Sequence, residues 1–148
     1  MKIKRIIAML LVAVMAFSII ACSGDYELSA KDVENVLKDL KKEEKIEDYE
    51  KIEMSFTDPD TGEKIELNLA ESIERMTEKE CKGEVTGGFW LNNDDDEGIF
   101  IFEETADAKL FADFWAEEEG DDCVSRIDNI VVFGEDKDVV KTVKDALK

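Results

Sequence analysis

Gly98-Ile99-Phe100-Ile101-Phe102 is the stretch of sequence that decides the fold, because it is an unbroken apolar run behind a single glycine. Successive side chains of a strand point to opposite faces, so a strand here is apolar on both of its faces. That pattern is typical of a central strand that is covered on both sides. Residues 85–91 precede it as the first arm of a hairpin, and the acidic residues 92–98 connect the two arms.

A helix is predicted directly after this strand, and we expect it to supply part of the cover. Thr105 is suited to cap the helix at its N-terminus. Four apolar residues follow at helical spacing and form its inner stripe: Ala108, Phe111, Ala112 and Trp115.

The chain before this hairpin predicts a helix, a second hairpin and a short helix. Ser29 and Asp32 can form a capping box before an apolar stripe of Val33, Val36, Leu37 and Leu40. Apolar and polar residues then alternate over 52–57 and again over 65–69, on either side of the turn-forming residues 58–63. Period two on both sides of a turn indicates a hairpin. Residues 70–80 can form the short helix, with Ile73 and Met76 on one face.

The C-terminal part predicts a third hairpin and a final helix. Residues 124–127 and 130–133 are joined by Asp128-Asn129, two residues that tolerate a positive φ. The final helix has an inner stripe of Val139, Val143, Ala146 and Leu147. This order of elements predicts an α+β fold, with a mostly antiparallel sheet built from hairpins and the helices packed on one face.

The N-terminus has the pattern of an export signal. Lys2, Lys4 and Arg5 precede an apolar run of 16 residues, which ends at Ile19-Ile20-Ala21-Cys22. This run is shorter than the roughly 20 residues of a membrane span. An ordinary secretory signal, the other alternative, prefers a small residue where Ile19 stands.

The four residues that end at Cys22 form a lipobox, so the N-terminus resembles those of bacterial lipoproteins. The resemblance implies cleavage before Cys22, a lipid on its sulfur, and a protein anchored at the extracytoplasmic face of the cell membrane. We therefore expect a signal peptide over 1–21, a lipidated tether over 22–28 and a single domain over 29–148. Residues 103–109 and 129–132 are also similar to small uncharacterised lipoproteins of clostridial-type bacteria, which imply no activity.

The charge balance restricts the partners. The chain holds 19 basic and 38 acidic residues, a net charge of −19, and removal of residues 1–21 takes away three of the basic ones. Such a protein repels nucleic acid and anionic lipid head groups. The partners that we expect are the membrane, through the lipid anchor, and a protein or another component of the envelope.

The composition also argues against an enzyme. The chain contains no histidine, which excludes nucleophiles activated by histidine and zinc sites that use it. Paired carboxylates remain, but among 38 acidic residues a pair at any given separation carries no information.

The densest cluster of oxygen ligands lies in the connection of residues 92–98. Calcium takes about six to eight oxygen ligands, and closely spaced carboxylates can supply several of them. The candidate ligands of a weak cation site are Asn93, Asp94, Asp95, Asp96 and Glu97. The alternative is a solvated turn without a dedicated site.

Two cysteines remain once Cys22 is lipidated. Cys81 and Cys123 each precede a predicted strand, and an exported domain can join such a pair in a disulfide. The alternative is two free, buried thiols. For function, we expect a non-catalytic binding or interaction module, with a calcium-dependent envelope module as the alternative. An exposed apolar patch favours the first, and converging carboxylates favour the second.

Overall fold

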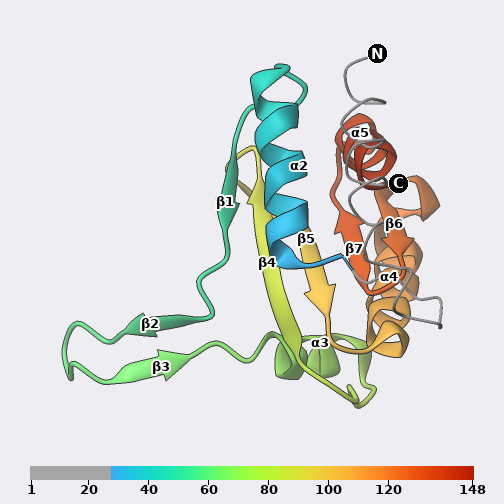
Figure 1. Cartoon of the computed structure of the whole chain (residues 1–148). Coiled ribbons are helices and arrows are strands. Elements are labelled where there is room, and N and C mark those ends of the chain that lie inside the picture. The colour runs from blue at the N-terminus through green and yellow to red at the C-terminus, as the bar shows by residue number, and fades with distance from the viewer. Residues whose placement is uncertain (1–27) are drawn as a thin grey trace, which may run out of the picture.

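A computed structural model describes residues 28–148 (Figure 1). The predicted signal peptide, Cys22 and nearly all of the predicted tether lie outside the described residues. The elements, in chain order, are α2 (Ala30–Lys42), β1 (Tyr49–Lys51), β2 (Ser55–Thr57), β3 (Lys64–Glu66), α3 (Leu69–Thr77), β4 (Val85–Leu91), β5 (Asp94–Phe102), α4 (Thr105–Glu119), a short 3-10 helix (Asp121–Cys123), β6 (Val124–Ile127), β7 (Ile130–Phe133) and α5 (Lys137–Leu147).

Five of the described strands form one antiparallel sheet in the order β1-β4-β5-β7-β6. The apolar strand quoted first is β5, and it lies at the centre of the sheet, between β4 and β7 (Figure 1). Ile99 is paired with Phe89 on one side and with Val132 on the other. The α+β class and the antiparallel sheet built from hairpins are therefore confirmed.

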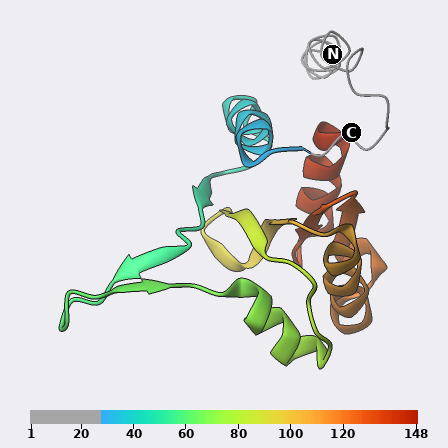
Figure 2. The same cartoon turned by 60° about the horizontal axis from the view of Figure 1, so that its bottom comes forward.

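Two layers of helices cover this sheet, one on each face. Ile99, Ile101 and Phe89 pack in a core cluster with residues of α2 and α5. Phe100 and Phe102 point the other way and pack with Ile73 of α3 and with residues of α4. Figure 2 shows α2 and α5 on one side of the sheet, with α3 and α4 on the other.

The prediction that all helices pack on one face is therefore wrong. A strand that is apolar on both faces is stabilised by burial of each face, and a face left in water forgoes that stabilisation. Strand β5 therefore requires a cover on each side. The neighbouring strand β7 is also buried along its whole length, with Ile130 and Val132 in one cluster and Val131 and Phe133 in the other.

The helix starts agree with the sequence in one case and differ in another. The side chain of Ser29 accepts a hydrogen bond from Asp32 at the start of α2, which forms the predicted capping box. Thr105 does not cap α4, because the helix begins with it and the residue at the cap position is Glu104, whose side chain makes no capping bond. The buried carboxylate of Asp107 lies in the first turn instead.

Asp107 joins the start of α4 to the segment before β4. Its two carboxylate oxygens accept hydrogen bonds from the backbone N–H of Lys82, at 2.9 and 3.0 Å. The backbone N–H of Gly83 donates to the same carboxylate at 2.8 Å. These bonds fix the connection from α3 into the sheet, and α3 follows β3 directly.

Candidate functional site

The acidic connection between β4 and β5 is not a loop of free carboxylates. The turn consists of Asn92 and Asn93, whose φ values of 54° and 57° are both positive. β5 already begins at Asp94, which is paired with Leu91, and the next pair joins Trp90 to Gly98. Residues 95–97 therefore form a bulge in the strand, and they are extra residues with no partner in β4.

The described candidate cation ligands do not converge, and the side chain of Asp95 lies outside the described part of the structure. Asn93, Asp94 and Asp96 are exposed, and the carboxylate of Asp94 accepts a hydrogen bond from the backbone N–H of Asp96 at 2.9 Å. Among residues 28–94 and 96–148, no group of three or more acidic, cysteine or histidine residues is placed to hold a metal ion.

Glu97 differs from its neighbours because it is only 5% exposed. The amide nitrogen of Asn92 donates to its Oε2 at 3.2 Å, whereas its Oε1 has no donor among the described residues. Burial raises the pKa of this carboxyl group, and the negative charges of Asp136 and Asp94 add to the increase. The amide oxygen of Asn92 in turn accepts from the backbone N–H of Glu47 at 2.7 Å, so this network holds the turn against the loop after α2.

The two cysteines of the described domain are free, so the predicted disulfide is not formed. Cys81 precedes Lys82, which is bonded to Asp107 in the first turn of α4. Cys123 lies beyond the other end of that helix, where its N–H donates to Gly120. A helix that rises 1.5 Å per residue separates these ends by about 20 Å. A disulfide needs Cα atoms within about 7 Å, so both thiols are free, as in the alternative, although only Cys123 is buried and Cys81 is half-buried.

Neither cysteine is placed as a nucleophile. Burial raises the pKa of the Cys81 thiol, and the nearby carboxylates of Asp107 and Glu74 raise it further. Cys123 is buried in the core. The thiolate is the reactive form of cysteine, and the surroundings of Cys81 oppose it.

The predicted hairpin of residues 52–69 is present, but its strands stand apart from the five-stranded sheet. β2 and β3 pair with each other in a sheet of two strands, in a register that puts Phe56 opposite Ile65. Both views show this hairpin extending away from the rest of the domain (Figures 1 and 2). We call residues 53–67 the hairpin arm.

Two backbone hydrogen bonds extend the pairing of the hairpin arm in both directions. Leu67 donates to the carbonyl of Met54 at 2.8 Å, and Asp58 donates to the carbonyl of Glu63 at 2.9 Å. Directly paired residues of antiparallel strands place their side chains on the same face. One face of the arm therefore carries its apolar side chains, which are Met54, Phe56, Ile65 and Leu67. We call this set the apolar face.

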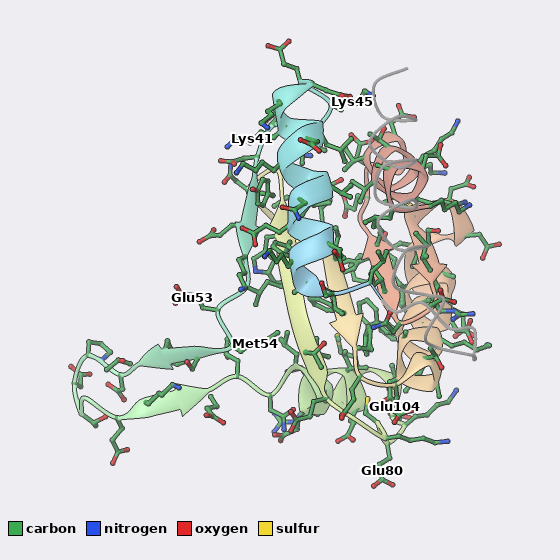
Figure 3. All side chains as sticks on the ribbon, viewed as in Figure 1. Lys41, Lys45, Glu53, Met54, Glu80 and Glu104 are labelled. Atoms are coloured by element: carbon green, nitrogen blue, oxygen red, sulfur yellow. The ribbon has the colours of Figure 1, made fainter. Side chains whose placement is uncertain are left out.

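Most of the apolar face is open to solvent. Phe56 is 47% exposed, Ile65 40% and Leu67 44%. Met54 lies at the base of the arm (Figure 3) and packs against the core cluster of α3 and α4. Beyond Met54, no described element covers this face. Period-two alternation normally indicates a strand with one buried face. In the hairpin arm the apolar face is formed, but no described element packs on it beyond Met54.

The turn and the other face of the hairpin arm are polar and acidic. Residues 53–67 contain five acidic residues and one lysine, a net charge of −4. At the turn, the N–H groups of Asp60 and Thr61 donate to the carboxylate of Asp58 and hold its pKa below the usual value. Gly62 has a φ of +70°, which closes the turn at little cost.

Sequence reasoning located the hairpin but did not identify it as exposed. It also based the short helix on both Ile73 and Met76, and in α3 Ile73 is buried whereas Met76 is 46% exposed. The available signal was the composition beyond Thr57, where acidic and turn-forming residues leave little apolar surface for a core.

A hollow of about 450 Å³ at the far end of α2 is the alternative to the hairpin arm as a site. Its lining includes Lys41 and Lys45, which lie at that end of the domain (Figure 3). Lys41 forms an ion pair with Asp48, and Lys45 forms one with Glu43. Because both cations already have partners, the hairpin arm is the stronger candidate site.

Among residues 28–148, no helix is long and apolar enough to cross a membrane. Comparison of the chain with protein families, curated proteins and solved structures gives no match.

Proposed function

We propose that this protein is a non-catalytic interaction module, anchored at the extracytoplasmic face of the cell membrane by a lipid on Cys22. The observation that carries the proposal is the uncovered apolar face of the hairpin arm. Contiguous apolar surface that a soluble domain leaves open marks a binding site for another molecule. The partner is a protein or another component of the cell envelope.

Covering the apolar face supplies part of the free energy of docking, and the rest comes from other contacts with the partner. Full burial of a large apolar side chain contributes about 1.5 to 3 kcal/mol. Phe56, Ile65 and Leu67 are each nearly half exposed, so covering all three contributes about 3 kcal/mol. The acidic residues beside them keep the free protein soluble, since like charges oppose association of the exposed faces.

The experiment is a photo-crosslinking comparison on intact membranes. The crosslinking residue p-benzoylphenylalanine replaces Phe56 in one protein and the exposed Glu117 of α4 in the other. We expect a discrete adduct from position 56 that is absent from position 117 and is lost when Ile65→Ser is added. The same adducts from both positions, or none from position 56, would contradict the proposal.

A calcium-dependent envelope module is the second candidate, and one observation favours it. Glu97 is a buried carboxylate in the acidic bulge whose Oε1 has no donor among the described residues. The test compares thermal unfolding in millimolar calcium with unfolding in a monovalent salt of equal ionic strength. A calcium-specific stabilisation that Glu97→Gln removes supports this candidate. Equal shifts in both salts reflect screening alone and exclude it.

A further inference from the structure

The outer edge of β2 is free to accept another strand. The bonds donated by Leu67 and Asp58 lie two residues to either side of the Phe56–Ile65 pair. In an antiparallel ladder, bonded positions alternate with positions whose backbone groups point outward. The N–H and C=O groups of Ser55 and Thr57 therefore point away from β3.

The two edges of the hairpin arm differ in how they are protected. Exposed edges are commonly blocked by charged side chains, proline or a bulge. The outward-pointing positions of β3 are the charged residues Lys64 and Glu66, whereas those of β2 are the neutral Ser55 and Thr57. Of the two edges of the hairpin arm, only the β2 edge therefore lacks charged side chains at its outward-pointing positions.

The charge of the arm specifies the chemistry of the added strand. The arm has a net charge of −4 within a chain of −19. An acidic or neutral segment gains nothing from this field, whereas a basic segment is attracted to it. A strand added to β2 also has alternate side chains beside Phe56 on the apolar face.

Building on the proposed function, we infer that β2 binds an extended segment of a basic partner protein in which apolar and basic residues alternate. The segment becomes the third strand of the arm, its apolar side chains extend the apolar face, and its basic side chains lie on the other face, within the negative field of the arm. A second copy of this chain is a poorer occupant, because pairing β2 with β2 brings two acidic arms together.

The experiment measures binding of fluorescent peptides to the full-length chain in neutral detergent, by fluorescence anisotropy. The main probe alternates valine and lysine. Three matched probes alternate valine with glutamate, alternate serine with lysine, or carry N-methyl groups on every second residue of the valine–lysine peptide. We expect the valine–lysine peptide to bind most tightly and to weaken as salt rises.

Two variants and one control test the place of binding. Phe56→Ser removes apolar surface and is expected to weaken the valine–lysine peptide about tenfold. Thr57→Pro removes an outward N–H of β2 without removing a bond to β3, and a comparable loss is expected. Lys64→Pro makes the same backbone change on the β3 edge and is expected to preserve binding. Fluorescence of Trp90 and Trp115, which lie outside the arm, checks that each variant is folded.

The outcomes separate this inference from the proposed function. Equal binding of the valine–glutamate peptide, or of the N-methylated one, overturns the basic-strand inference and leaves the apolar docking site in place. Self-association that Phe56→Ser abolishes also overturns the inference, with a second copy as the occupant. Equal binding of the serine–lysine peptide, with no effect of Phe56→Ser, leaves only bulk charge and overturns both.

Discussion

Replacing Asp107 is expected to destabilise the domain more than any other single change to a charged side chain of α4. The carboxylate is only 3% exposed and accepts from the backbone N–H groups of Lys82 and Gly83. Asp107→Ala leaves these two partly buried donors without their acceptor. A buried donor that loses its partner costs about 1 to 3 kcal/mol.

The expected loss follows from these contacts. Two partly buried N–H groups without an acceptor cost about 2 kcal/mol together, at the lower end of this range, and loss of a negative charge in the first turn of a helix adds about 0.5 kcal/mol. Asp107→Asn keeps one acceptor oxygen but turns an amide N–H₂ toward the same donors, so about half of that loss is expected.

The assay is urea unfolding of the purified full-length chain, followed by tryptophan fluorescence. The matched control is Asp113→Ala in the same helix, because Asp113 is exposed and only forms an ion pair with Lys109. Exposed ion pairs contribute less than about 1 kcal/mol. If Asp107→Ala and Asp113→Ala lower the free energy of unfolding equally, Asp107 does not join α4 to the segment before β4.

Three further predictions concern single side chains. The raised pKa of Glu97 means that its protonated form favours folding below its usual value of 4.5, and that this stabilisation is lost as the pH rises through the pKa of the folded protein. The unfolding free energy of Glu97→Gln, relative to that of the wild type, should therefore increase between pH 4 and pH 8. Urea unfolding at each pH measures this difference, and a difference that stays constant would refute the prediction. Thiol titration of unfolded, unreduced Cys22→Ala protein should find two free thiols, from Cys81 and Cys123. A count of no free thiols would show instead that the two residues form a disulfide. A fatty-acid analogue should label the wild type and not Cys22→Ala, and equal labelling would exclude lipidation at that residue.

The sequence was sufficient for those elements whose signals are local. The capping box at Ser29 uses groups three residues apart, and the alternation on either side of residues 58–63 specifies a hairpin without reference to the rest of the chain. The apolar run of Ile99 to Phe102 even indicated a central strand covered on both faces. These patterns depend on the geometry of helices and strands, which every chain shares.

Other features depend on groups that are distant in the sequence. The polar anchor of the helix start is Asp107 and not the expected Thr105 cap, and its partners Lys82 and Gly83 are 25 and 24 residues away. The bulge before Gly98 buried Glu97, although Asp94 and Asp96 before it are exposed. The position of the bulge decides which carboxylate of the acidic run is buried, and composition does not predict that position.

What the sequence determined by itself is that the hairpin arm has an apolar face, because alternation places Phe56, Ile65 and Leu67 on one side. Only the tertiary structure decided that this face is uncovered. The five-stranded sheet is already covered on both faces by four helices of the described domain, so the hairpin arm has no second layer to pack against. An apolar pattern reports a tendency to be buried, and whether a cover exists depends on how the other elements have filled the core.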